Sequence, residues 1–315
     1  MRVEEFYFDS RDNQTKIHGI RYMPDTQNVS GVVQIIHGMS EHVARYEEFA
    51  RFMTERNFVV VGENHLGHGK TVGENGIQGY FCKQDPATVV VRDSHRLKKM
   101  TQELYPGVPY FIAGHSMGSF MLRNYMAKYG TGIDGAIIMG TGQMSAGLIA
   151  IAKMIVTVQK LFMGGKHPGK LLDNMAFGSC NKRIENPKTS VDWLCSDETV
   201  ISKYLEDKEC GFTFTVNGFE TLFELITRAG KKEYIEQIPK ELPVFIIAGT
   251  KDPIGEYGKA VKKVYEGMKT ANIQDVTLKL YEESRHEILN DIEKETVKND
   301  IYHWITAQMA KKSGE

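Results

Sequence analysis

A glycine-flanked serine in the first half of the chain constrains the fold more than any other feature. The apolar run Tyr110–Ala113 leads directly into Gly114-His-Ser-Met-Gly118, and the helical pattern Phe120–Lys128 follows. A serine placed between a strand and a helix in this way lies on a sharp, strained turn, and the two glycines leave room for strand and helix to approach each other. The segment therefore predicts an exposed, nucleophilic Ser116 supported by Gly114 and Gly118.

A serine hydroxyl needs a histidine to accept its proton and a carboxylate to orient that histidine. Asp252 directly follows the predicted strand Val244–Ala248, and His286 lies a few residues after the predicted strand Val276–Tyr281. Both positions are expected at the carboxyl edge of a parallel sheet, in the chain order Ser, Asp, His. An aspartate before proline is also a common turn former, but three matching positions in one order favour a catalytic triad of Ser116, Asp252 and His286.

The negatively charged intermediate of acyl transfer needs two N–H donors. The backbone amide of Met117, directly after the serine, is expected to supply one. The loop after the predicted strand Val32–Ile36 is expected to supply the other from Met39, with Gly38 allowing close approach of the backbone.

The rest of the chain alternates short apolar runs with helical patterns, which is typical of a doubly wound, mostly parallel sheet. An antiparallel hairpin is expected to open the chain, at Arg2–Phe8 and Lys16–Tyr22. The further predicted strands are Val32–Ile36, Phe58–Gly62, Tyr110–Ala113, Ala136–Met139, Val244–Ala248 and Val276–Tyr281.

Strand patterns are missing from the middle of the chain, which we interpret as an inserted, mainly helical cap. The predicted division is a first part of the core at 1–141, the cap at 142–230 and a second part of the core at 231–315. The apolar stretch Leu148–Met163 is interrupted by Lys153 and Lys160 and is expected to be too short to span a membrane.

Composition excludes several other classes of protein. The 39 basic and 40 acidic residues nearly cancel without a basic cluster, so nucleic acid is not an expected partner. The start of the chain lacks the pattern of a secretory signal, and four scattered cysteines favour free, buried thiols, so a cytoplasmic location is expected. His65 and His68 have no further ligands nearby in the sequence, so no metal site is predicted there.

Nearly the whole chain resembles the monoglyceride lipase and lysophospholipase branch of the α/β-hydrolases. The similarity is carried by the serine motif, by the segments of Asp252 and His286, by His37-Gly-Met-Ser-Glu-His-Val-Ala-Arg-Tyr46 and by His65-Leu-Gly-His-Gly-Lys-Thr71. Asn64 and Leu66 depart from the Asp-His-Arg-Gly-His-Gly pattern of that branch. The resemblance implies the α/β-hydrolase fold, no cofactor, and hydrolysis of single-acyl glycerol esters or lysolipids through an acyl-enzyme on Ser116.

The cap is expected to contribute the substrate pocket. The residues predicted to line an acyl tunnel are Leu148, Ile151, Ile155 and Phe162, although an apolar helical stripe also fits simple packing onto the core. Four lysines, Lys153, Lys160, Lys166 and Lys170, are expected either to face an anionic lipid surface in peripheral contact or to be solvated.

Other reactions fit the same triad, because the triad does not define the acyl donor. A short-chain or phenolic-ester carboxylesterase is one alternative, and a serine aminopeptidase is a weaker one. An aminopeptidase would use acidic cap residues to bind the free amine of its substrate, and the candidates are Glu198, Glu206, Asp207, Glu209, Glu220 and Glu224. A non-catalytic receptor is disfavoured because every catalytic position is present. The oligomeric state is not predicted.

Overall fold

The computed structural model describes residues 1–314. Within them, one eight-stranded sheet runs through the molecule in the order β1-β2-β4-β3-β5-β6-β7-β8. The first three strands in this order pair antiparallel, and all later neighbours pair parallel. The strands are β1 (Arg2–Asp9), β2 (Lys16–Met23), β3 (Gly31–Ile36), β4 (Phe58–Glu63), β5 (Tyr110–His115), β6 (Gly135–Met139), β7 (Val244–Gly249) and β8 (Val276–Tyr281).

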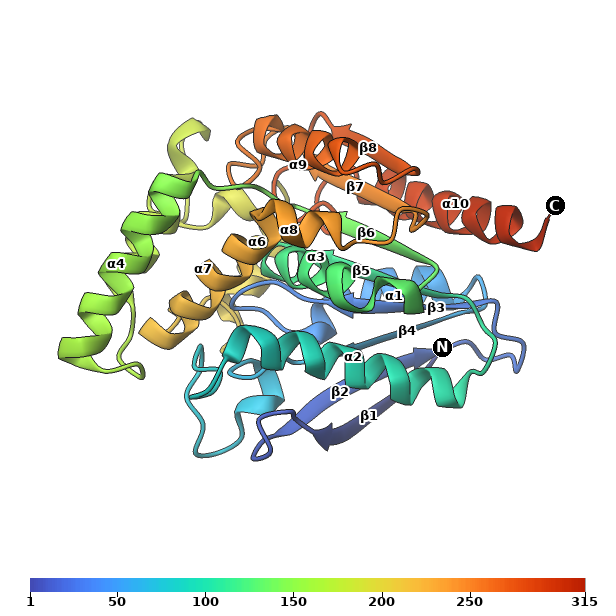
Figure 1. Ribbon diagram of the computed structural model, residues 1–315, viewed down its shortest axis with the longest axis horizontal. Helices are drawn as coiled ribbons and strands as arrows, with labels where there is room; N and C mark the ends of the chain where they lie inside the picture. Colours follow the sequence, from blue (N-terminus) through green and yellow to red (C-terminus); the bar gives the residue numbers. More distant parts are fainter. Residues whose placement is uncertain (315) are drawn as a thin grey trace.

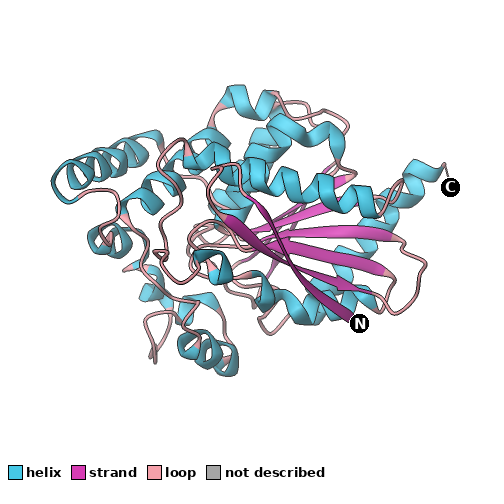
Figure 2. Cartoon of the chain, turned by 90° about the horizontal axis from the view of Figure 1, so that it is seen from below, coloured by secondary structure: helices cyan, strands magenta, loops and turns pink. Residues whose placement is uncertain are grey.

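Helices cover both faces of the sheet, as Figure 2 shows. Alternate residues of each central strand join different hydrophobic clusters: on β5, Ile112 faces one cluster and Phe111 the other. The helices on the first face are α2 (Pro86–Leu104), α3 (Met117–Tyr129) and α9 (Lys259–Thr270), and those on the second are α1 (Glu47–Thr54) and α10 (Lys294–Ser313). This arrangement confirms the predicted α/β-hydrolase fold with its doubly wound, mostly parallel sheet.

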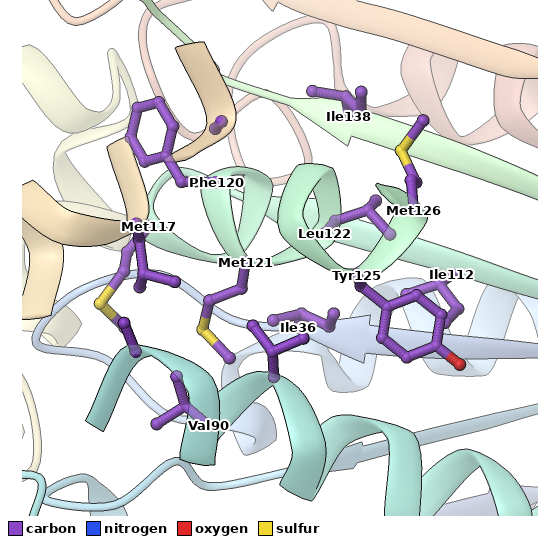
Figure 3. Close-up of a cluster of buried hydrophobic side chains, with 14 of the residues drawn as sticks. Ile36, Val90, Ile112, Met117, Phe120, Met121, Leu122, Tyr125, Met126 and Ile138 are labelled. Carbon is purple, nitrogen blue, oxygen red and sulfur yellow. The ribbon is translucent and has the colours of Figure 1, made fainter. Parts of the chain in front are cut away.

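Helix α3 is the best-buried helix of the core. Every residue from Met117 to Met126 is buried, and Figure 3 shows its side chains between Ile36, Ile112 and Ile138 of the sheet and Val90 of α2. Complete burial of a leucine, methionine or phenylalanine side chain contributes about 1.5–3 kcal/mol to the stability of the fold. This packing fixes where α3 begins, and so fixes the residue directly before it, Ser116.

A helical insertion separates β6 from β7. It contains α4 (Ala146–Met163), α5 (Lys170–Phe177), α6 (Glu198–Glu206), α7 (Val216–Gly230) and α8 (Lys232–Glu236). Helix α7 packs against α3 of the core and against α4, and its buried side chains belong to the main core. A separate small cluster around Trp193 and Tyr204 stabilises the remainder of the insertion. The exact limits of a cap at 142–230 stay a prediction.

Helix α4 lies at the outer edge of the molecule, away from the sheet (Figure 1). It begins earlier than the apolar stretch suggested, because the Ser145 side chain accepts a hydrogen bond from the amide of Leu148 and caps it. By length and composition, α4 is the one helix among residues 1–314 that is long and apolar enough to cross a membrane, and 11% of its residues are buried. This corrects the expectation that the stretch is too short and too interrupted. A single span at α4 would nevertheless place β6 and β7, which are paired neighbours, on opposite sides of a membrane.

Candidate active site

Ser116 lies on a strained turn between β5 and α3. Its φ of 52° and ψ of −118° are outside the regions that side chains normally allow. A Cβ on Gly118 would lie 2.0 Å from the carbonyl oxygen of Ile36, and one on Gly114 would lie 2.4 Å from that of Gly118. Only glycine fits at these two positions, as the motif predicted, and Ser116 is left partly exposed at the carboxyl end of β5.

His286 and Asp252 come together from the loops after β8 and β7. Nδ1 of His286 lies 2.9 Å from Oδ2 of Asp252, and the side chains are 2% and 0% exposed. The amide of Ile254 donates to the other carboxylate oxygen at 2.8 Å, which holds the carboxylate in position. Nε2 of His286 has no hydrogen-bond partner among the described residues, and His286 and Ser116 line the same cavity. In a Ser-His-Asp triad, this nitrogen is the one that accepts the serine proton.

The two predicted oxyanion donors flank Ser116. Met117 is the first residue of α3, so its amide has no partner within the helix. Met39 lies in the loop after β3, and both cavities that reach Ser116 are lined by Met39. Gly38 lies close against Ser116: a Cβ there would meet Glu41 at 2.7 Å and the Ser116 side chain at 3.2 Å. We call residues 37–42, from His37 to His42, the oxyanion loop.

A buried ionic cluster packs against the oxyanion loop and holds it in place. Oε1 of Glu41 accepts hydrogen bonds from the amide of Gly38 at 2.5 Å and from the hydroxyl of Tyr46 at 3.0 Å. Arg45 bonds Oε2 of Glu41 at 2.9 Å and both carboxylate oxygens of Glu287 at 2.7 Å. Burial opposes ionisation of Glu41, but the bond to His115 and the charge of Arg45 hold its pKa well below the usual range.

His115 connects this cluster to His286. Its Nδ1 lies 3.3 Å from Glu41, and its Nε2 lies 3.1 Å from the backbone oxygen of His286. Burial lowers the pKa of His115, but the bond to Glu41 and its charge outweigh burial and raise it. The sequence analysis assigned no role to His115 and so missed this positioning role. The segment Glu-His-Val-Ala-Arg-Tyr contains Glu41, Arg45 and Tyr46 of the buried cluster, and these residues could have indicated a partner for His115.

His65 stacks on His37, and His68 packs against both rings at an angle. The ring centroids of His37 and His65 are 3.8 Å apart, and their nitrogens bond to backbone groups. Burial lowers the pKa of His65 to about 3 and that of His68 to about 4. These neutral rings act as packed, hydrogen-bonded structural residues.

Two cavities meet at Ser116. The smaller one, about 320 Å³, is lined by the oxyanion loop, by His286 and by Trp193, Tyr204 and Asp173 of the cap. The larger one, about 490 Å³, is mostly apolar and runs between α3, α4, α5 and α7. Its apolar lining residues include Met117, Phe120, Leu148, Ala152, Leu222 and Phe223.

The cap residues predicted to line the pocket separate into two groups. Leu148 lines the larger cavity as expected. Ile151 and Phe162 are 51% and 80% exposed, and Ile155 packs against the core, so among the described residues these three do not line it. The expectation for them is corrected, because α4 turns its small residues Ala152 and Val156 inward.

Two of the cap lysines form ion pairs with glutamates of the cap. Lys153 bonds Glu224 at 2.7 Å, and Lys160 bonds Glu220 at 2.7 Å, both across to α7. The side chains of these two lysines are still 38% and 46% exposed, which agrees with the expectation of a solvated face. Contact with an anionic lipid surface stays a prediction. None of the six acidic residues considered for an aminopeptidase lines either cavity at Ser116.

The fold and the serine, histidine and aspartate at its sheet edge define the class of protein: an α/β-hydrolase. Residues 27–293 match the family described as serine aminopeptidase, S33, and the chain belongs to that family.

Similar proteins narrow the class. Human monoglyceride lipase is 27% identical over 296 residues, which are 92% of this chain and 87% of that protein. The monoacylglycerol lipase of Mycolicibacterium smegmatis is 23% identical, over 91% of this chain and 92% of its own. A thermostable carboxyl esterase from Bacillus coagulans, solved with glycerol, is 31% identical with a TM-score of 0.88, over 98% of this chain and 99% of its own. The chain is thus a carboxylic ester hydrolase of the monoglyceride lipase-like branch.

Proposed function

We propose that the protein is a serine hydrolase that cleaves single-acyl lipids, with monoacylglycerol as the preferred class. Oγ of Ser116 attacks the ester carbonyl carbon while Nε2 of His286 takes the serine proton. The amides of Met39 and Met117 stabilise the negative oxygen, and His286 then gives the proton to the departing alcohol. Water, activated by His286, hydrolyses the acyl-enzyme and restores Ser116.

The observation that carries this proposal is the pair of unlike cavities that meet at the nucleophile. The larger, apolar cavity provides room and apolar contacts for an acyl chain. The smaller cavity has polar groups from Asp173, Asn174, Ser190 and Tyr204, which fit a small hydroxylated leaving group such as glycerol. Relatives that carry the names monoglyceride lipase and monoacylglycerol lipase support the same assignment.

The charge of the smaller cavity favours glycerol esters over lysophospholipids. None of its described lining residues is lysine or arginine, and Asp173 adds a carboxyl group, while Glu41 and Glu287 are already paired with Arg45 and His115. A phosphodiester headgroup would therefore find no lysine or arginine in this cavity to pair with. The six cap acids considered for an aminopeptidase lie outside both cavities, and Asp173 is the cap acid that lines the smaller one. The aminoacyl anilide in the experiment below tests whether this cavity accepts an amine.

The exposed face of α4 supports peripheral contact with lipid. The side chains of Ile151, Met154, Val158, Leu161 and Phe162 are between 50% and 80% exposed, and a lipid surface would bury them. We expect Leu161→Ser with Phe162→Ser to weaken co-sedimentation with neutral phosphatidylcholine vesicles while leaving hydrolysis of a soluble short-chain ester unchanged. Equal co-sedimentation of wild type and variant would contradict this contact.

The proposal also includes a cytoplasmic location. It is supported by Cys82, Cys180, Cys195 and Cys210, all free and buried, which suits a reducing compartment. Recovery of the protein outside the cytoplasmic fraction of its native cells would contradict it.

The central experiment compares initial rates of wild type and Ser116→Ala on p-nitrophenyl esters of increasing chain length, monoacylglycerol, lysophosphatidylcholine and an aminoacyl anilide. We expect wild-type rates to peak on medium or long acyl chains, to be higher on monoacylglycerol than on lysophosphatidylcholine, and to vanish in the variant. A preference for acetyl, feruloyl or aminoacyl substrates would overturn the lipid assignment while keeping the triad.

A further inference from the structure

Three potential metal ligands meet where the cap touches the oxyanion loop. His42 is the last residue of that loop, and Asp207 and Cys210 lie in the turn that follows α6. Nε2 of His42 is 2.8 Å from Oδ2 of Asp207, and the three donor atoms all lie within 4.8 Å of one another. Tetrahedral zinc with bonds of about 2.0–2.3 Å holds its ligands at separations of this order.

The type of donor points to zinc rather than to magnesium or calcium. Imidazole nitrogen, carboxylate oxygen and thiolate sulfur together suit a borderline-soft divalent ion, whereas magnesium and calcium prefer oxygen ligands alone. Asp207 is held in place because its Oδ1 accepts the amide of Glu209 at 2.8 Å. The side chains of His42 and Asp207 are 11% and 35% exposed, so an ion has a path from solvent and water can complete its coordination.

Hydrogen bonds already join groups that a bound metal ion would link. Oδ2 of Asp207 lies 2.8 Å from Nε2 of His42, and its Oδ1 accepts the amide of Glu209 at 2.8 Å. Two donors from different segments are thus aimed at one carboxylate. One divalent cation would take the place of these protons: the thiol proton leaves for solvent as the sulfur–metal bond forms, and the ion is balanced by one carboxylate and one thiolate.

The other histidine cluster shows what a purely structural arrangement looks like. Nδ1 and Nε2 of His68 bond to the backbone of Leu66 and Ser40, and both nitrogens of His37 bond to backbone groups. Their nitrogens therefore bond to the backbone, whereas Nε2 of His42 bonds the carboxylate of Asp207, with the thiol of Cys210 nearby.

We propose that His42, Asp207 and Cys210 form a zinc-binding site that ties the turn after α6 to the oxyanion loop. The two segments already contact each other next to the oxyanion donor Met39. The carbonyl oxygen of Ser40 accepts the amide of Gly211 at 3.0 Å, and the hydroxyl of Ser40 donates to the carbonyl of Phe212 at 2.6 Å. An ion at this junction fixes the spacing between cap and loop, so its occupancy alters turnover as well as stability.

The test uses full-length protein freed of metal with a chelator. Cobalt(II) serves as the spectroscopic probe, since a thiolate ligand gives a charge-transfer absorption band, and zinc binding is measured by calorimetry. We expect one ion per chain, the thiolate band in wild type, and a thermal unfolding midpoint that rises with zinc concentration. Cys210→Ser should abolish the band and weaken zinc binding at least tenfold, and zinc should change the rate on a soluble ester in wild type but not in this variant.

Cys195→Ser is the matched control. Cys195 is a buried thiol of the same cap cluster, but its Sγ bonds the backbone oxygen of Asn290 and lies outside the site. It should keep the band, the stoichiometry and the response to zinc. If Cys210→Ser fails to fold, His42→Gln tests the same affinity.

Absence of one-to-one binding in wild type, or a band that survives in Cys210→Ser, would overturn the site. Calorimetry, absorption and thermal unfolding need no substrate, so a failure of the ester assignment would leave them unaffected.

Discussion

Narrowing the larger cavity tests whether it holds the acyl chain. Ala152 of α4 is 5% exposed and lines this cavity with the smallest side chain available to a chiral residue. The larger side chain of Ala152→Trp fills space that the acyl chain of the substrate would occupy. Each methylene that loses its apolar contact costs about 0.8 kcal/mol, so excluding four methylenes costs about 3 kcal/mol, which is roughly a hundredfold in kcat/KM.

The assay is kcat/KM on butanoyl and dodecanoyl p-nitrophenyl esters. We expect the variant to lose about a hundredfold on the long ester and to stay close to wild type on the short one. Thr157→Trp is the matched control, because Thr157 lies on the exposed side of the same helix, outside the cavity. Equal losses on both esters, or the same loss in the control, would refute the assignment of this cavity to the acyl chain.

Three further predictions concern the triad, a buried carboxyl and the nucleophile turn. Asp252→Asn should lower kcat by about four orders of magnitude, because the amide favours the wrong tautomer of His286; near-normal turnover would remove Asp252 from the triad. Burial raises the pKa of Glu63 to about 8 from an ordinary 4.5, so its contribution to stability is full below pH 4.5 and is lost as the pH rises through 8. Glu63→Gln should therefore gain stability relative to wild type between pH 5 and 8.5, by about 3–5 kcal/mol, and denaturant unfolding at several pH values that shows no such trend would argue against a protonated Glu63. Gly118→Ala forces a contact of 2.0 Å with the backbone of Ile36; we expect the purified variant to melt at a lower temperature and lose ester hydrolysis, and wild-type behaviour would contradict the close packing.

The strands of the sheet and the positions of the residues around Ser116 could be predicted from the sequence. Each predicted strand is present, because β-branched runs separated by helical patterns leave few alternatives for a parallel sheet. Ser116, Asp252 and His286 lie at strand ends in the expected order, and the fold brings the loops of one sheet edge together. Local patterns and topology thus placed these residues without knowledge of any side-chain contact.

The orientation of α4 could not be derived in the same way. Apolar side chains surround most of this helix, so hydrophobic periodicity does not indicate which face turns inward. The ion pairs of Lys153 with Glu224 and Lys160 with Glu220 help to fix that face against α7. The lysines are seven residues apart on α4 and the glutamates four apart on α7, which places each pair on one helix face. The matching spacing of lysines and glutamates is visible in the sequence. It indicates the orientation of α4 only once α4 and α7 are known to be neighbours.

The cluster around Glu41 shows why the segment after β3 needs so many polar residues. Burying the Glu41 carboxylate would be strongly unfavourable without partners, yet His115 bridges Glu41 and the backbone oxygen of His286, an arrangement that uses both ring nitrogens. When both nitrogens donate, His115 is positively charged, and with Arg45 it balances the carboxylates of Glu41 and Glu287. The cluster is then neutral as a whole, and the same carboxylate that completes it holds the amide of Gly38. The position of the oxyanion loop and the position of His286 therefore depend on one buried charge balance.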